Sequence, residues 1–219
     1  MKISIVIPTL NEGKNLSTVL KDIPKSVDEV IVVDGHSTDN TVKIAKEFGA
    51  RVIFDDVGKG SALRKGMGAA KGDVVITMDA DCSHKSSEIG LLTEGINAGF
   101  DICMGSRFIQ GGGTEDMPWF RRLGNKFFVF LVNLIWNMHY SDLCYGYRSF
   151  RKSCIKKLRL KEDGFGIETE IAIKAAKKKL RVLEIPSFEK GRAAGEGKLR
   201  TFGDGWTILK TIMKEIFSD

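Results

Sequence analysis

The sequence has few residues of the kind that bind metals through sulfur or nitrogen. It contains four cysteines and three histidines in 219 residues, and no two cysteines are spaced as CxxC. This scarcity argues against a Cys/His zinc site. Widely separated cysteines are typical of reduced thiols, so we expect a cytoplasmic protein.

Long apolar runs are absent as well. The first apolar run, at residues 3–7, ends at Pro8 and is too short for a secretory signal. The longest nearly apolar stretch, residues 127–136, has roughly half of the ~20 residues that a membrane-spanning helix needs. We therefore expect no signal peptide and no transmembrane segment.

Composition and charge indicate one globular domain with an anionic partner. The apolar fraction is 42% and the charged fraction 28%, which excludes a wholly disordered or fibrous chain. Residues 1–110 carry a net charge of −2 and residues 111–219 a net charge of +8. The basic half favours a lipid surface, a phosphorylated substrate or a nucleic acid. Nucleic acid is disfavoured because no basic-aromatic stacking motif is present.

Short apolar runs alternate with helical segments in the first half of the chain. This alternation predicts an α/β fold with a mostly parallel central sheet flanked by helices, in a single domain spanning residues 1–219. The expected strands are 3–7, 29–34, 51–54, 73–79, 101–105 and 181–185. The expected helices are 11–22, 40–48, 61–71, 86–98, 119–137, 167–179 and 206–217, with a polar-aromatic turn at 141–150 and a glycine-rich loop at 190–205.

Polar clusters follow three of the expected strands, where open parallel sheets bind ligands. They are residues 8–12, residues 34–39 and the pair Asp79 and Asp81. Two carboxylates two residues apart can direct oxygen ligands at one Mg²⁺ or Mn²⁺ that bridges to phosphate. The alternative interpretation is a strand-end carboxylate plus a helix cap. For Asp34, Ser37 and Asp39 the alternative is an Asx turn and an N-cap.

Residues 58–64, GKGSALR, resemble a phosphate-binding loop but fit neither GxxxxGK[ST] nor GxGxxG. A glycine-rich turn at the start of a helix offers N–H groups to an anion. Glycines required by a tight turn are the equally weighted alternative.

Five segments in order carry a family resemblance: IPTLNEGKNL, VIVVDGHSTDNT, GKGSALRKGMGAAKGDVVITMDAD, MGSRF and DLCYGYRSFRK. Together they resemble family 2 glycosyltransferases of the GT-A fold, and most of all the dolichyl- and polyprenyl-phosphate sugar synthases. The resemblance implies an inverting transfer of a hexose from a GDP- or UDP-sugar to dolichyl or polyprenyl phosphate at the cytoplasmic membrane face. It implies a nucleotide-sugar-binding half, residues 1–106, and an acceptor- and membrane-facing half, residues 107–219. Many such relatives continue into transmembrane helices, which we do not find here.

The resemblance also assigns roles to residues. It implies that Asp79 and Asp81 hold Mg²⁺ or Mn²⁺, and that Arg107, Arg121 and Arg192 lie near phosphates. Pro8, Glu12, Asp34 and Asp39 would hold the base and ribose, although Gly35 stands where the family often has a second carboxylate. The remaining candidates for donor binding are Thr9, Ser37, Lys59, Arg64 and Lys198.

The acceptor decides which residues are catalytic. A lipid phosphate is already anionic and needs cations, for which Arg107 is the first candidate. A hydroxyl acceptor would need a general base, and Asp142, Glu168 and Glu170 are the candidates. Asp81, one of the two expected metal ligands, is also counted as catalytic. A nucleotidyltransferase is disfavoured because no glycine-rich loop follows the first strand. A non-catalytic scaffold that docks on anionic lipids is a further alternative.

Two apolar helices allow contrasting interpretations. Residues 127–136 are apolar almost all round, which favours a buried helix. Arg121, Arg122 and Lys126 precede them, however, and this pattern is also typical of a helix that lies in a membrane interface. The helix at 206–217 allows the same two interpretations. The loops 108–118 and 190–205 are glycine-rich, and we expect them to close over the donor.

Overall fold

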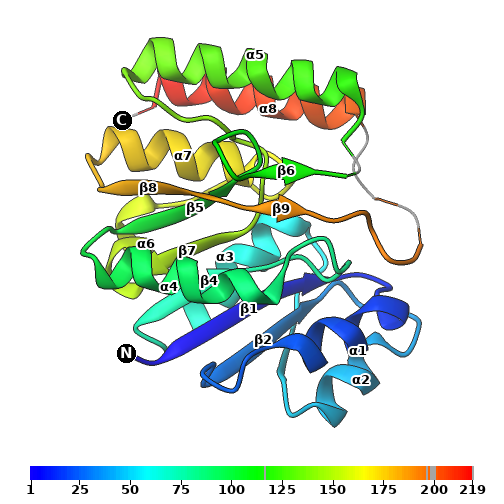
Figure 1. Ribbon diagram of the computed structural model, residues 1–219. Helices are drawn as coiled ribbons and strands as arrows, with labels where there is room; N and C mark the ends of the chain where they lie inside the picture. The colour runs from blue at the N-terminus through cyan, green and yellow to red at the C-terminus, as the bar shows by residue number, and fades with distance from the viewer. Residues whose placement is uncertain (116, 196, 198–200, 219) are drawn as a thin grey trace.

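A computed structural model describes residues 1–115, 117–195, 197 and 201–218 (Figure 1). Its centre is a seven-stranded sheet in the order β3-β2-β1-β4-β7-β5-β8. All neighbouring strands are parallel except β7, which runs antiparallel between β4 and β5. The bounds are β1 (Ile3–Thr9), β2 (Glu29–Asp34), β3 (Arg51–Phe54), β4 (Val74–Thr77), β5 (Ile102–Ser106), β7 (Arg148–Arg151) and β8 (Val182–Pro186).

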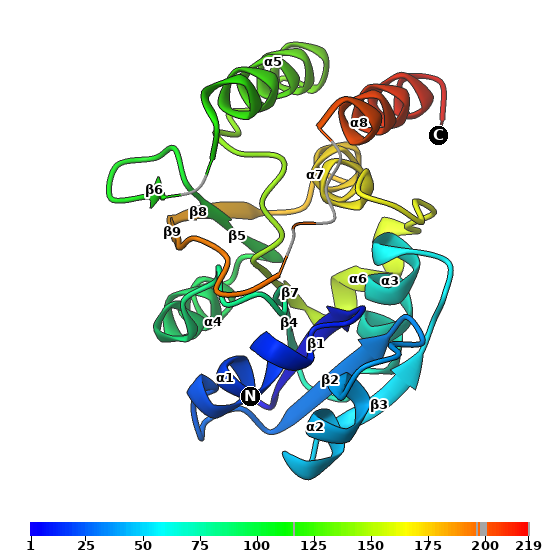
Figure 2. The same cartoon turned by 90° about the vertical axis from the view of Figure 1, so that its right-hand side faces the viewer.

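Helices cover both faces of this sheet and form two apolar cores (Figure 2). On one face lie α1 (Gly13–Asp22), α2 (Thr41–Glu47) and α4 (Ile89–Asn97), the last preceded by a short 3-10 turn at Ser86–Glu88. On the other lie α3 (Lys59–Ala69), α6 (Lys152–Leu158) and α7 (Ile167–Lys177). Beyond α7, α5 (Trp119–Trp136) and α8 (Thr201–Ile216) lie side by side at the β5–β8 end of the molecule (Figures 1 and 2).

The expected strands and their mostly parallel arrangement are confirmed, but β6 (Gly113–Thr114), β7, β9 (Phe188–Glu189) and α6 were not expected, and β7 is the one at the centre of the sheet. Residues 148–151, placed in a polar-aromatic turn by the sequence, form β7 at the centre of the sheet. The strand is short and polar at its ends. It is buried because Arg148 donates its guanidinium hydrogens to the carbonyls of Leu143, Tyr145 and Glu168. The guanidinium of this buried arginine therefore supplies hydrogen-bond donors to backbone carbonyls of the preceding turn and of α7.

The expectation that residues 127–136 are buried is wrong. In α5 only Asn125 and Val132 are buried. Phe127, Phe130 and Leu134 expose 51%, 60% and 68% of their surface. One side of the helix packs against α7 and α8, and its other apolar side faces outward. Among the residues described, no helix is both long and apolar enough to cross a membrane.

A second, two-stranded sheet lies beside the carboxyl ends of β5 and β8 (Figure 1). It pairs β6 (Gly113–Thr114) with β9 (Phe188–Glu189) in parallel. The backbone bond from the Gly113 N–H to the Ser187 carbonyl fastens β6 to the end of β8. This small sheet places Glu189 next to the loop that follows β5.

Candidate active site

A cleft of about 1080 Å³ opens at the carboxyl ends of the parallel strands. One part of its lining contains the strand-end residues for which the sequence predicts donor binding, and we call this part the donor side. It includes Pro8, Thr9, Glu12, Gly35, Lys59, Asp79, Asp81 and Glu168. The other end of the cleft is lined by Arg107, Arg121, Asn125, Tyr145 and Glu189, and then by Phe120 and Phe128 of α5 and Ile208 of α8. The cleft thus joins the strand-end carboxylates to arginines and to the two outer helices.

Lys59 joins two carboxylates at the donor side of the cleft. Its Nζ lies 2.9 Å from Asp79 Oδ1 and 3.0 Å from Glu168 Oε1. Asp79 follows β4, Glu168 stands in the first turn of α7, and Lys59 begins α3. Gly146 closes the cluster from above, because a Cβ there would lie within 3.4 Å of all three charged groups.

The charges of this cluster stabilise one another. Burial disfavours the ammonium of Lys59, but Asp79 and Glu168 outweigh that effect and raise its pKa. Burial would likewise raise the pKa of Asp79, yet the charge of Lys59 holds it below its usual range. Both groups are therefore charged at neutral pH. Glu168 Oε1 is paired with the Lys59 ammonium, whereas a general base needs an oxygen that is free to take a proton from the acceptor.

Arg192 pairs with Asp81 and with Glu12 on the same side of the cleft. Its guanidinium lies 3.3 Å from Asp81 Oδ2 and donates to both carboxylate oxygens of Glu12 at 2.6 and 2.7 Å. The segment that carries it is fastened to the same loop, since the Ala193 N–H donates to the Asp81 carbonyl. The Asn15 side chain adds a bond to the Ala194 carbonyl. The start of the 190–205 loop therefore lies across the donor side of the cleft.

An aromatic layer supports the carboxylate loop from behind. The backbone N–H of Asp79 donates to His84 Nδ1 at 3.0 Å, and burial lowers the pKa of this imidazole. The His84 ring stacks on Tyr147 at 4.6 Å and meets Tyr145 edge-on. Tyr145 in turn lies 4.8 Å beneath the Arg107 guanidinium. Through His84 and Tyr145, the layer connects the loop of Asp79 to Arg107 at the other end of the cleft.

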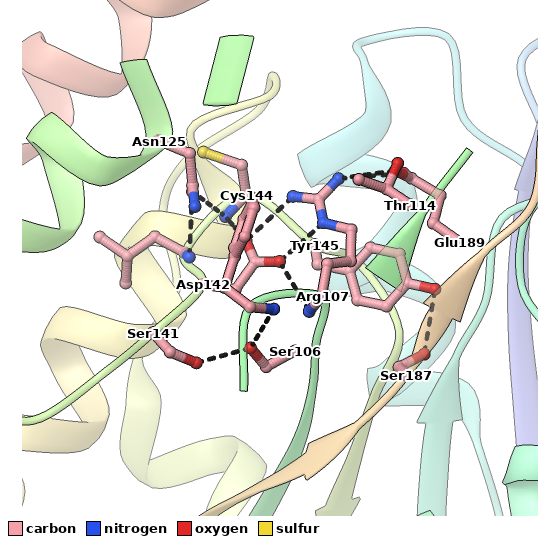
Figure 3. Close-up of polar contacts among 12 residues, drawn as sticks. Ser106, Arg107, Thr114, Asn125, Ser141, Asp142, Cys144, Tyr145, Ser187 and Glu189 are labelled. Carbon is pink, nitrogen blue, oxygen red and sulfur yellow. Dashed lines mark hydrogen bonds and ion pairs between the residues drawn. The ribbon is translucent and has the colours of Figure 1, made fainter. Parts of the chain in front are cut away.

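Arg107 follows β5 and is enclosed by carboxylates (Figure 3). Its Nε and one terminal nitrogen donate to the two oxygens of Asp142 at 2.7 and 2.9 Å. The other terminal nitrogen donates to both oxygens of Glu189 at 3.0 and 3.1 Å. Burial opposes the charge of Arg107, but these carboxylates raise its pKa. Asp142 is fully buried.

The family profile named Glycosyl transferase family 2 matches residues 4–159 of this chain. The chain belongs to glycosyltransferase family 2. It is 36% identical to the dolichol-phosphate mannosyltransferase of Pyrococcus furiosus over 91% of this chain, and it spans 60% of the length of that relative. It is 33% identical to the dolichyl-phosphate hexose transferase of Haloferax volcanii, over 97% of this chain and 92% of that protein.

Solved structures identify the architecture of this glycosyltransferase. The glucosyl-3-phosphoglycerate synthase of Mycobacterium tuberculosis, solved with Mn²⁺, UDP and phosphoglyceric acid, superposes with a TM-score of 0.78 at 22% identity. That match covers 100% of this chain and 79% of the synthase chain. The expected GT-A fold, with its central sheet flanked by helices, is confirmed.

Asp34, Ser37 and Asp39 of this glycosyltransferase do not line the cleft. Asp34 is fully buried and accepts hydrogen bonds from the Thr9 hydroxyl and from the backbone N–H of Ser37. Asp39 accepts from the N–H groups of Gly13 and Thr41. These residues hold the loop after β1 against the loop after β2, and they shape the wall that Pro8 and Thr9 present to the cleft.

Two amides of the segment GKGSALR already have an acceptor within the protein. The N–H groups of Gly60 and Ser61 both donate to the Asp163 carbonyl, at 2.7 and 3.2 Å. A Cβ on Gly60 would lie 2.4 Å from the Glu162 carbonyl oxygen. The glycines thus allow α3 to begin directly against residues 162–164, which favours the tight-turn alternative for Gly60. Arg64 pairs with Asp163 outside the cleft.

Other candidates fall into three groups. Arg121 lines the cleft from α5. Glu170 lies outside it, where it accepts from the backbone of residues 161 and 162 and pairs with Lys174 at 2.6 Å. Lys198 lies outside the described residues. The polar residues that the sequence did not single out are Glu189, His84, Tyr145 and Arg148; the YGYR part of DLCYGYRSFRK was the available signal for the last two.

The described residues supply part of a ligand set for a divalent cation. They contain no cluster of three or more His, Cys, Asp and Glu side chains arranged around a common point. Asp79 and Asp81 nevertheless both line the cleft with side chains 28% and 23% exposed. Mg²⁺ in nucleotide sites is commonly bound by one or two carboxylates plus phosphate oxygens, which is the donor set available here.

Proposed function

We propose that this glycosyltransferase moves a hexose from a GDP- or UDP-sugar to dolichyl or another polyprenyl phosphate, with inversion at the anomeric carbon. The observation that carries the proposal is that one cleft is lined by Asp79 and Asp81, by Arg107, and by residues of the outer helices α5 and α8. The names of the Pyrococcus and Haloferax relatives support it.

The donor would bind at the carboxylate side. Asp79 and Asp81 would hold Mg²⁺ or Mn²⁺, which stabilises the charge of the departing nucleoside diphosphate when bound. Lys59 and Arg192 lie against the same carboxylates and bring further positive charge to the diphosphate. Pro8 and Thr9 supply the wall for the nucleoside.

The acceptor phosphate would bind at the arginine side. A phosphate oxygen is anionic at neutral pH, so it attacks the anomeric carbon without a general base, and the nucleoside diphosphate leaves from the opposite face of the sugar. Such a single displacement inverts the configuration. Asp142 is unsuited to act as a base because it is buried and both of its oxygens accept from Arg107. It positions that arginine instead.

The apolar surface of α5 suits a membrane interface. Its exposed large side chains recur every three or four residues along one side of the helix, and Arg122 and Lys126 flank them. These side chains are Trp119, Leu123, Phe127, Phe130 and Leu134. On α8, Trp206 and Met213 are exposed beside Lys210 and Lys214. We infer peripheral binding at the cytoplasmic face, where the polyprenyl phosphate would present its headgroup to the cleft.

The test combines transfer and vesicle binding. Purified protein with Mg²⁺ or Mn²⁺ is given labelled GDP- or UDP-hexoses and dolichyl phosphate in anionic vesicles, and NMR of the product reports the anomeric configuration. The double variant Phe127→Ser/Leu134→Ser should lose vesicle binding and transfer to dolichyl phosphate, while keeping transfer to a short, soluble prenyl phosphate. The control Leu91→Ser changes a leucine on α4 that is 51% exposed, and it should retain both.

Three outcomes would count against the proposal. Transfer to no prenyl phosphate with any donor would reject the function. Transfer only to hydroxyl acceptors would favour a Glu168-based mechanism. Vesicle binding without nucleotide binding would favour a lipid-docking scaffold.

A further inference from the structure

The two carboxylates that hold Arg107 differ in their surroundings. Asp142 is fully buried, and its Oδ1 also accepts from the Cys144 backbone N–H at 3.2 Å. The Glu189 side chain is 20% exposed and lines the cleft. One carboxylate is therefore a fixed part of the interior, while the other stands where a ligand can reach it (Figure 3).

Glu189 presents its two oxygens to a single nitrogen of Arg107, at 3.0 and 3.1 Å. The two-nitrogen fork of this guanidinium is already occupied by Asp142. A phosphate monoester offers oxygens of greater negative charge to the remaining nitrogen, and a charged N–H group bonds to a carboxylate or to a phosphate oxygen in the same way. Glu189 therefore stands where a phosphate oxygen could accept from Arg107.

Glu189 also has a second hydrogen-bond partner. The Thr114 hydroxyl donates to its Oε2 at 2.6 Å. Glu189 belongs to the two-residue strand β9, which pairs with β6 and is not a member of the central sheet. A carboxylate displaced from Arg107 thus keeps the Thr114 hydroxyl as a donor.

We propose that Glu189 occupies the place of the acceptor's phosphate at Arg107 and thereby selects the acceptor by charge. The inference rests on the proposed function. A tethered carboxylate competes at a high effective concentration, so an incoming anion must bind Arg107 more strongly than a carboxylate does. A dianionic phosphate monoester meets this condition. Singly charged phosphodiesters and carboxylates on the same lipid chain do not.

The test compares Glu189→Gln with the matched control Glu115→Gln. Glu115 is an exposed carboxylate next to Thr114 whose contact is to the Gly191 N–H, so its change removes the same charge near the same strands without touching Arg107. Glu189→Gln should lower the KM for a short prenyl phosphate about tenfold, the factor that corresponds to 1.4 kcal/mol. It should also make a prenyl carboxylate and a prenyl methyl phosphodiester effective competitors. The donor KM should not change, and Glu115→Gln should behave like the wild type.

Thr114→Val provides a test with the opposite sign. It removes the second partner of Glu189 and keeps the charge, so displacement becomes harder and the acceptor KM should rise. If Glu189 merely supported the fold, both variants would weaken acceptor binding. Should Glu189→Gln fail to fold, the discrimination by Thr114→Val between phosphate monoesters and singly charged analogues decides: it exceeds that of the wild type if Glu189 competes with the acceptor, and it equals that of the wild type if Glu189 only supports the fold.

Several results would overturn the inference. An unchanged or raised acceptor KM in Glu189→Gln, or an unchanged discrimination against singly charged analogues, would show that Glu189 does not compete with the acceptor. These outcomes presuppose wild-type transfer to prenyl phosphate. If the wild type transfers to none, the proposed function itself fails, so the two failures are distinguishable.

Discussion

Removal of the Lys59 ammonium is the sharpest test of the charge cluster at the donor side. Lys59→Met keeps the length and apolar stem of the side chain and removes only the cation. Asp79 and Glu168, held 2.9 and 3.0 Å from Nζ, then face one another without a counter-charge. We expect the free energy of unfolding to fall and the affinity for a divalent cation to rise, because the two carboxylates become available to it.

The magnitude follows from burial. Removing one partner of a buried ion pair costs about 3–5 kcal/mol. Glu168 is 4% exposed but Asp79 is 28% exposed, so part of the charge stays solvated and the lower end, about 3 kcal/mol, applies. For a chain of this size that corresponds to a Tm about 6–12 °C lower. Saturating Mn²⁺ at 100 times its Kd should return about 2.7 kcal/mol.

The pH dependence has a defined sign. The pKa of Asp79 is lowered from 3.8 in the folded state, so its contribution to stability is present above that pH and is lost as the pH falls through the folded value. The pKa of Lys59 is raised above 10.5, so its contribution persists until the pH rises beyond that value. The difference in Tm between wild type and Lys59→Met should therefore be constant at neutral pH and should narrow below about pH 4.

Differential scanning calorimetry with and without Mn²⁺, from pH 3.5 to 8, measures these quantities. Lys43→Met, at an exposed lysine whose side chain is 74% accessible, is the control and should differ little from wild type. Equal Tm values for wild type and Lys59→Met at pH 7, or a Mn²⁺ response no larger in the variant, would refute the reasoning.

Two further predictions concern residues that the structure reassigns. Gly60→Ala should unfold at a much lower denaturant concentration, or fail to fold, because its Cβ would lie 2.4 Å from a backbone oxygen; Gly68→Ala in the same helix has nothing within 4 Å and should stabilise the protein by about 0.5–1 kcal/mol. Asp142→Asn should cost about 3 kcal/mol of stability, the lower end of the range for breaking a buried ion pair, because Arg107 loses the anion to which it donates twice but keeps Glu189. Wild-type stability with lost turnover in Asp142→Asn would instead support a catalytic base.

Much of the fold follows from local patterns. The runs ISIVI and EVIVVD are β-branched, apolar and short, as strands covered on both faces must be, and helical segments separate them. Strand β7 escaped this reasoning because its residues, RSFR, are polar except for Phe150 and lie at the end of a segment that resembles a turn. The Arg148 guanidinium bonds to two nearby carbonyls, those of Leu143 and Tyr145, and to the carbonyl of Glu168 in α7, and this last contact is one that no local pattern reveals.

The sequence predicted which residues line the site, but it did not predict which of them form ion pairs with one another. Asp79, Asp81, Arg107 and Arg192 all line the cleft that the strand ends predicted. The sequence distance between the partners explains why the pairing was not foreseen. Arg107 and Glu189 are 82 residues apart, and Arg192 and Glu12 are 180 residues apart. Each pair exists only because the chain returns through β8 and β9 to the edge where β1 and β5 end.

The outward face of α5 shows why apolar periodicity has two solutions. A helix that is apolar almost all round lowers its free energy by burying both sides, and within a domain this predicts an interior helix. Here α7 and α8 cover one side only, so Phe127, Phe130 and Leu134 remain exposed. The apolar pattern of a sequence indicates how much of a helix surface is apolar. It does not indicate whether other helices or a membrane cover that surface. Because the exposed Phe120 in the first turn of α5 also lines the cleft that holds Arg107, we expect an apolar phase on this helix to bring a lipid-linked phosphate to that cleft.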